Sequence, residues 1–207
     1  VDQVGYSRDG AWSFPKGMVW VKHFDLELER GNPATAKRIE TRVLVKNQTE
    51  EVSNFAVLPG EAPCKAMVPD NASLEATWMM PGFDDTAWAA AVTGIGYDED
   101  PTYTSLFGAG GNLGNLMNGV NTSVYVRIPF QINDAASIEK LTLRMKYDDG
   151  FVAYLNGQQV ASANPPATAL AYNSGASANN PDGNAVNFED FDLDAFTALL
   201  LEGENVL

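Results

Sequence analysis

The sequence predicts an all-β protein whose strands are antiparallel. In residues 141–147 apolar and polar side chains alternate with a period of two, which indicates a strand with one buried face. The turn-forming run Asp148-Asp149-Gly150 follows, and residues 151–155 form a second apolar strand that ends in Asn156-Gly157. Because Asn-Gly is the dipeptide most typical of a two-residue hairpin turn, residues 141–160 predict two tight reversals, in a central hairpin and in the return after it.

Two further strands are predicted near the N-terminus. Residues 17–28 carry largely apolar side chains on both alternating faces, as a central strand does. In residues 38–46 apolar and mostly charged positions alternate, and a polar loop around Gly31-Asn32-Pro33 separates the two segments. We therefore expect residues 1–55 to form a long-looped hairpin. It either adds to the sheet of residues 56–207 or belongs to a truncated neighbouring domain.

The middle of the chain combines short strands with a long loop. Residues 66–100 contain a short strand, Trp78 and the phrase FDDTAW at residues 83–88. Residues 101–119 are rich in Gly and Asn, which disfavour the interior of a strand or helix, so we expect a long exposed loop there. Residues 121–130 then return to an apolar pattern and predict a strand.

The C-terminal part predicts a loop, a helix and a strand. After a Pro- and Asn-rich loop at residues 162–184, residues 192–201 place apolar side chains at helical spacing. Asp192 or Asp194 fits the N-cap of this helix, and Gly203 fits the position after its end. Residues 204–207 should open a last strand. Because the chain starts without Met and stops inside that strand, we expect a fragment of a longer precursor.

Charge and composition restrict the partners. The 207 residues include 27 acidic and 13 basic side chains, which gives a net charge of −14. Such a surface repels nucleic acids and anionic membranes, so we expect neither as a partner. It suits an extracellular surface or the binding of cations. The hydrophobic content of 45% argues against a disordered chain.

The residues that usually carry catalysis are scarce. The single cysteine, Cys64, and the single histidine, His23, exclude an intrachain disulfide and a zinc cluster. His23 lies within a predicted strand, which favours a structural imidazole, and Cys64 is interpreted as an incidental thiol. Neither a Gly-x-Ser-x-Gly nor a His-Glu-x-x-His motif occurs. Asp148 and Asp149 could be calcium ligands or an acid–base pair, but the glycine that follows favours a turn whose carboxylates cap backbone amides. Because the sequence shows no catalytic constellation, we expect no enzyme.

Four phrases occur in an order that carries a family resemblance: FDDTAW (83–88), SVYVRIPF (123–130), YDDGFVAYLNGQQVA (147–161) and LLLEGENVL (199–207). In these phrases residues 66–207 resemble the galactose-binding-like domains of secreted bacterial hydrolases and surface proteins. The resemblance implies an antiparallel jelly-roll β-sandwich, in which the aspartates of the first phrase cap a turn and Trp88 enters the core. It also implies a secreted or cell-surface location, extracellular or periplasmic.

Residues 12–49 resemble a different domain, which accompanies sugar-dehydrogenase-like propellers and c-type haem modules in large secreted bacterial proteins. The chain has no Cys-x-x-Cys-His signature, so nothing about haem is inferred from this likeness. The neighbouring domains of the same polypeptide are the partners that it implies.

We interpret the chain as a non-catalytic, carbohydrate-binding-like module that binds a polysaccharide or glycan through its end loops. The alternative is a structural or adhesive domain that packs against a catalytic or redox neighbour and binds no sugar. Aromatic rings beside loops can stack on sugars, and amides can bond to their hydroxyls. The candidate ligand-binding residues are Tyr97, Tyr103, Phe107, Asn112, Asn115, Tyr172 and Asn173.

A structural calcium ion is the one cofactor that we consider. Calcium takes six to eight oxygen ligands from several segments, and acidic residues are frequent in three loops of the predicted sandwich. The alternative is that these loops are solvated acidic surface. The candidate metal ligands are Asp84, Asp85, Asp98, Asp100 and Glu189.

Overall fold

The computed structural model describes residues 19–27, 36–45, 56–99 and 101–207. The chain divides into two compact units, Val1–Asn54 and Phe55–Leu207. The sequence analysis placed the boundary one residue later. Each unit is described by itself.

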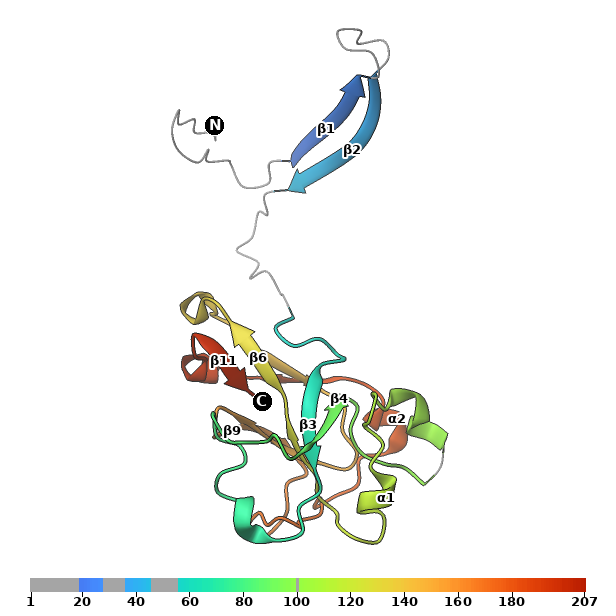
Figure 1. The fold of residues 1–207 in the computed structure, drawn as a ribbon, viewed down its shortest axis with the longest axis vertical. Coiled ribbons are helices and arrows are strands. Elements are labelled where there is room, and N and C mark those ends of the chain that lie inside the picture. Colours follow the sequence, from blue (N-terminus) through green and yellow to red (C-terminus); the bar gives the residue numbers. More distant parts are fainter. Residues whose placement is uncertain (1–18, 28–35, 46–55, 100) are drawn as a thin grey trace. The chain divides into compact units, whose positions relative to one another are not determined.

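The first unit contains two antiparallel strands, β1 (Val19–Glu27) and β2 (Ala36–Val45) (Figure 1). Their register runs from Val19 opposite Val45 to Glu27 opposite Ala36, with an irregularity between Phe24 and Asp25. The two strands of the predicted long-looped hairpin are thus confirmed. The side chains of this unit, including that of His23, lie outside the described part of the structure.

The second unit is all-β, and its paired strands are antiparallel. Its core-forming strands come from the segments in which apolar and polar residues alternate. In the three-stranded sheet, β3 (Pro63–Met67) lies between β4 (Ala89–Val92) and β5 (Tyr125–Arg127). The remaining pairs are β6 (Pro129–Ile132) with β11 (Gly203–Val206), β7 (Thr142–Met145) with β10 (Glu189–Asp192), and β8 (Phe151–Leu155) with β9 (Gln158–Ala163).

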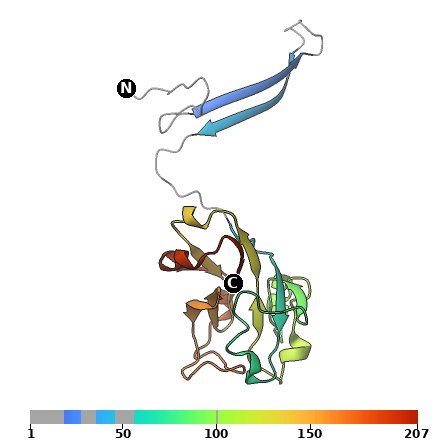
Figure 2. The same cartoon turned by 60° about the vertical axis from the view of Figure 1, so that its left-hand side comes forward.

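Helices are short and lie at the periphery of the second unit, as Figures 1 and 2 show. The α-helices are α1 (Gly114–Met117) and α2 (Asp182–Ala185); the 3₁₀ turns are Ala72–Leu74, Pro101–Leu106, Ala135–Ser137 and Asp194–Leu199. No helix among the described residues has the length and apolar character needed to cross a membrane.

The predicted Asn-Gly turn joins β8 to β9. Asn156 has a φ of 51° and Gly157 a φ of 90°, which are the positive values that a type I′ turn requires at both central residues. The Asn156 side chain also reaches β11, because its Oδ1 accepts a hydrogen bond of 2.9 Å from the backbone N–H of Val206. The turn therefore connects one strand pair to another.

The expected hairpin across residues 148–150 is wrong. The strand before this corner, β7, pairs with β10, and the strand after it, β8, pairs with β9. The corner thus carries the chain from one pair to the other. It is tight, because a Cβ on Gly150 would lie 2.7 Å from the carbonyl oxygen of Ala163. Asp149 caps a backbone group as expected, accepting from the N–H of Asn180 at 3.0 Å.

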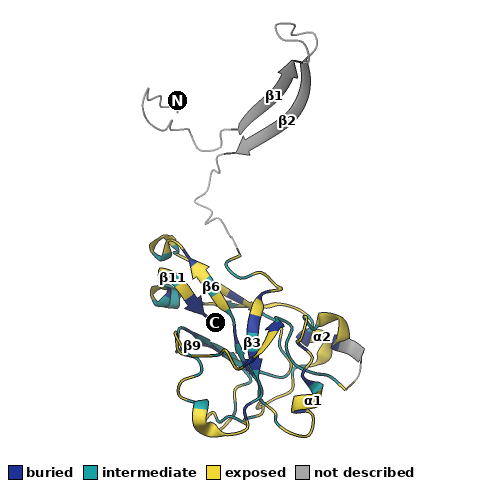
Figure 3. Ribbon diagram, viewed as in Figure 1, coloured by how far each residue is buried: buried dark blue, intermediate teal, exposed yellow. Residues whose placement is uncertain are grey.

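The main hydrophobic core draws on the alternating segments. Leu143 of β7 and Leu155 of β8 are buried, as the period-two pattern predicts, and they pack with residues from β6, β9 and the C-terminal region. Figure 3 colours buried residues dark blue, for example on β3 and β11. The buried members of this core are Ile132, Leu143, Ala153, Leu155, Val160, Leu193 and Leu200. A second, smaller core consists of Ala66, Leu113 and Met117.

Residues 101–119 are not the long exposed loop that their composition predicts. Tyr103, Leu113 and Met117 are buried, and the segment contains a 3₁₀ turn and α1. The glycines allow close approach to other backbone segments rather than exposure. A Cβ on Gly108 would lie 2.3 Å from the carbonyl oxygen of Val92, and one on Gly111 would lie 2.1 Å from that of Gly94.

The predicted C-terminal helix is a 3₁₀ turn, Asp194–Leu199, and β11 follows it. Leu193 is the N-cap residue of this turn and Leu200 its C-cap, so the expected N-cap at Asp192 or Asp194 and the expected position of Gly203 directly after the end are wrong. Asp192 Oδ1 accepts a hydrogen bond of 2.8 Å from the backbone N–H of Asp194. Asp194 Oδ1 accepts instead from the N–H of Leu141 at 2.8 Å. The strand expected at residues 204–207 is confirmed, and its ladder extends to mutual hydrogen bonds between Leu207 and Ile128.

Candidate functional site

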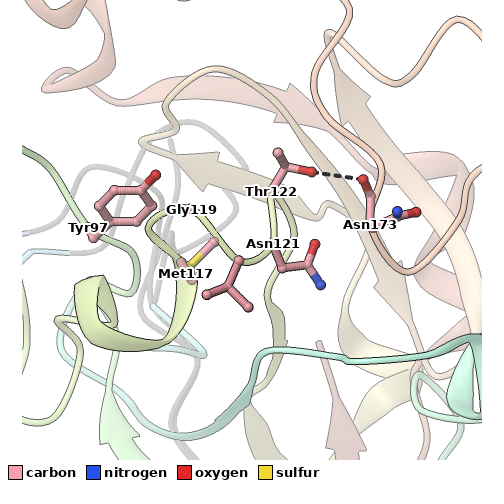
Figure 4. A pocket seen from close by; sticks show the side chains of 7 residues that line it. Tyr97, Met117, Gly119, Asn121, Thr122 and Asn173 are labelled. Atoms are coloured by element: carbon pink, nitrogen blue, oxygen red, sulfur yellow. Dashed lines mark hydrogen bonds between the residues drawn. The ribbon is translucent and has the colours of Figure 1, made fainter.

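Two adjoining cavities lie beside β3 and α1 in the second unit. Their volumes are about 240 and 440 Å³, and they share Val120, Asn121 and Asn173. We call the two together the loop groove. The smaller cavity is lined by Tyr97, Met117, Gly119, Val120, Asn121, Thr122 and Asn173 (Figure 4). The larger is lined by residues 66–70 and 87–89 and by Leu116, Val120, Asn121, Tyr172 and Asn173.

Asn121 joins three segments around the loop groove. Its Nδ2 donates to the carbonyl oxygen of Pro69, which follows β3, and to that of Tyr172 at 3.4 Å. Its Oδ1 accepts from the N–H of Ser123 at 3.1 Å. Both ends of this amide are therefore used inside the protein, and the side chain positions the walls.

Hydroxyl groups next to Asn121 fix the segment that carries Tyr172 and Asn173. Thr122 Oγ1 donates to the carbonyl oxygen of Asn173 at 2.8 Å, and Ser123 Oγ donates to that of Ser174 at 2.6 Å. The backbone N–H of Tyr172 donates to Glu75 Oε1 at 2.6 Å. Since all of these bonds involve backbone groups, they fix the path of residues 172–174 beside the groove.

The side chain of Asn173 is available for binding. Its amide forms no hydrogen bond with the described residues, and Asn173 is an exposed residue. Figure 4 shows it across the smaller cavity from Tyr97, with Met117, Gly119 and Asn121 between them. An amide supplies two donors and an acceptor, which is the pattern that a sugar hydroxyl can satisfy.

The apolar rim of the loop groove is exposed. Leu116 is 54% exposed and Val120 is 75% exposed, whereas Trp88, which also lines the larger cavity, is buried. The Trp88 ring lies in an aromatic cluster in which Trp78 and Tyr125 are stacked, with ring centroids 4.4 Å apart. Trp88 thus enters the interior, as expected.

Three of the seven predicted ligand-binding residues line the loop groove: Tyr97, Tyr172 and Asn173. The others do not. Asn112 Oδ1 accepts from the N–H of Gly114 at 3.0 Å at the start of α1, and Asn115 is exposed on that helix. Phe107 is half-buried in the glycine-rich segment. The structure thus concentrates the candidate site on fewer side chains than the sequence suggested.

Tyr103 is buried near carboxylates rather than exposed to a ligand. Burial raises the pKa of its phenol above the ordinary value, and the negative charges of Asp148 and Asp182 raise it further. The pKa of Asp148 is raised as well, first by burial and then by the charges of Asp149, Asp182 and Asp98. Asp98, Asp148 and Asp182 therefore lie near one another and near the Tyr103 side chain.

The predicted metal ligands take separate roles. Asp84 accepts from the N–H and the hydroxyl of Thr86 at 3.1 and 2.6 Å, and these bonds lower the pKa of its carboxyl group. Asp85 forms a salt bridge with Arg127, and Glu189 accepts from the hydroxyl of Tyr147 at 2.6 Å.

Asp98 lies near Tyr103, and Asp100 lies outside the described residues. Within the described part of the chain, no group of three His, Cys, Asp or Glu residues has an arrangement that could hold a metal ion.

Sequence reasoning missed Leu116, Val120 and Asn121. The polar run Asn121-Thr122-Ser123 just before β5 was a signal for Asn121, since short polar side chains commonly bond to backbone groups. No pattern in the sequence distinguishes Leu116 and Val120 from buried Leu113 and Met117 in the same segment.

The lining groups suit binding more than acid–base chemistry. Asp70 is the one carboxylic acid among them, and its Oδ1 accepts from Asn71 Nδ2 at 2.6 Å.

Comparison of the chain with protein-family models, with curated proteins and with solved structures found no match.

Proposed function

We propose that this chain is a non-catalytic carbohydrate-binding module of a secreted bacterial multidomain protein, and that the loop groove binds the glycan. The single observation that carries the proposal is that Tyr97 and Tyr172 line the two adjoining cavities of the loop groove and that Asn173 lines both. Aromatic faces and a free amide are the groups that a sugar ring and its hydroxyls require.

The proposal also includes a galactose-binding-like jelly-roll sandwich for residues 56–207. It is supported by the antiparallel pairing found in all the strands from β3 through β11, and by the four phrases that resemble that family. Two of these phrases meet in space, because Asp85 of FDDTAW is paired with Arg127 of SVYVRIPF. The loop groove lies next to the same two segments, at Trp88 and at residues 121–122.

The test is binding of the full chain to a broad glycan array, followed by measurement of dissociation constants for the glycans retained. Asn173→Ala and Tyr172→Ala should each weaken binding by about 0.5–1.5 kcal/mol, which is roughly 2–13-fold. Asn179→Ala is the matched control, because Asn179 is an exposed asparagine outside the groove lining. A folded wild-type chain that binds no glycan would overturn the proposal.

A second candidate function is supported by the exposed Leu116 and Val120. In this alternative the groove packs against a neighbouring domain of the same polypeptide and binds no sugar. Apolar side chains gathered at one exposed place commonly mark a protein contact. The two candidates differ in one outcome. If the groove is a contact face, purified neighbouring domains should bind to it and no glycan should.

A further inference from the structure

We infer that the loop groove selects neutral glycans and rejects those that carry carboxylate or sulfate groups; this inference rests on the proposed function. Its basis is the charge of the lining. Asp70 is the one acidic or basic side chain among the described residues that line the two cavities. An anionic sugar bound there would be desolvated beside a carboxylate, with no lysine, arginine or histidine of the lining to pair with it.

The nearest lysine in the sequence lies outside the lining. Lys65 directly precedes the lining residue Ala66, and its Nζ donates to the carbonyl oxygen of Trp88 at 3.4 Å, so its ammonium remains charged but is bonded to the backbone. Lys65 itself lines neither cavity. In addition, the net charge of −14 repels an anionic polymer before it reaches the groove.

The groups that remain free match a neutral sugar. Asn173 offers donors and an acceptor together, and a hydroxyl can use both, whereas a carboxylate can only accept. Leu116 and Val120 present an exposed apolar rim, which fits the C–H face of a sugar ring and gains nothing from a charged substituent. The charge of the lining, its free amide and its apolar rim therefore all favour a neutral glycan.

The closing experiment compares glycans that share a backbone and differ in charge. Full-length chain is tested against dextran and dextran sulfate, and against fully methyl-esterified and de-esterified polygalacturonan, together with the array of neutral glycans. We expect binding among neutral glycans, and at least tenfold weaker binding of each charged partner than of its neutral form. Raising the salt concentration should narrow that difference, because salt screens the repulsion.

Two variants separate a local effect of Asp70 from net charge. Asp70→Lys and Glu139→Lys each change one acid to a base, so both shift the net charge from −14 to −12, but exposed Glu139 lies outside the groove lining. Asp70→Lys should gain at least tenfold in affinity for an anionic glycan over Glu139→Lys. Equal affinities of the two variants, or wild-type preference for charged glycans, would overturn the neutral-ligand inference alone. Absence of binding to every glycan would overturn the proposed function as well.

Discussion

Asp85 and Arg127 form a salt bridge of 2.8 Å between Oδ2 and Nε, and the Arg127 side chain is only 6% exposed. The same guanidinium donates through one Nη atom to the carbonyl oxygens of Trp78 and Met80, the latter at 3.1 Å. It also lies 5.3 Å from the centre of the Phe83 ring. One buried arginine on β5 thus contacts four residues of the segment before β4, namely Trp78, Met80, Phe83 and Asp85.

Removal of the Asp85 carboxylate should therefore be costly. Asp85→Ala leaves the buried charge of Arg127 without its ion pair, and we expect a loss of about 3 kcal/mol in the free energy of unfolding. Urea denaturation monitored by tryptophan fluorescence measures this loss. Asp84→Ala is the matched control, since Asp84 is exposed and only caps Thr86, and it should cost clearly less than Asp85→Ala. Equal losses for the two variants would contradict the role given to Arg127.

Asn205 is a second buried polar centre, and it is 1% exposed. Its Oδ1 accepts from Asn156 Nδ2 and from the N–H of Leu201, both at 2.8 Å, and its Nδ2 donates to the carbonyl oxygens of Leu201 and Gly203. Asn205→Ala should lower the free energy of unfolding by about 3 kcal/mol or more, because four partly buried hydrogen bonds of this buried amide are lost. Asn179→Ala, at an exposed position, should change it by less than about 0.5 kcal/mol. Thermal and urea unfolding of both variants would reveal an error if Asn205→Ala were neutral.

Strands β7 and β8 show which parts of the fold the sequence does and does not reveal. Period-two alternation and the Asn-Gly dipeptide depend on local geometry, so they predicted β7, β8 and the turn into β9 correctly. The partner of a strand is not a local property. Asp148-Asp149-Gly150 permits a reversal of the chain but does not specify which strand pairs with β7. In the structure β7 pairs with β10 instead of β8.

Part of the candidate site could also be predicted from local features of the sequence. Tyr97, Tyr172 and Asn173 were predicted from their residue types beside loops, and the structure brings them to one groove. Tyr103 was predicted in the same way and is buried, because its segment folds back against the strands through glycines that tolerate close backbone contact. Residue type alone does not distinguish a loop that faces water from one that packs.

The glycine contacts give a third prediction. Gly108→Ala would place a Cβ 2.3 Å from the Val92 carbonyl oxygen and 2.5 Å from that of Thr93, so backbone segments must separate. We expect a loss of about 2–3 kcal/mol in the free energy of unfolding. Gly183→Ala is the control, because a Cβ on Gly183 in α2 meets nothing within 4 Å, and it should be neutral or stabilising by up to about 1 kcal/mol. Differential scanning calorimetry of the two variants distinguishes a packed segment from a loose loop, for which both substitutions would behave alike.

The fourth prediction concerns the pH dependence that arises from Asp148. Because burial and nearby negative charges raise its pKa in the folded state, the folded protein binds a proton here more readily than the unfolded chain. This group's contribution to the free energy of unfolding therefore falls as the pH rises from about 3.9, the ordinary aspartate value, through the raised pKa, and stays unfavourable at neutral pH. Asp148→Asn should stabilise the protein at pH 7, by no more than about 1 kcal/mol, because the carboxyl group is only partly buried and solvent screens its charge.

The measurement is urea unfolding of Asp148→Asn and of the wild type between pH 3 and pH 8. The gain at pH 7 should shrink as the pH falls through the raised pKa and vanish at the acidic end, because the wild-type carboxyl is then protonated in both states. Glu139→Gln removes one negative charge from an exposed position and controls for net charge. A gain of the same size for both variants, or one that does not change with pH, would show that repulsion around Tyr103 does not contribute to the stability of the fold.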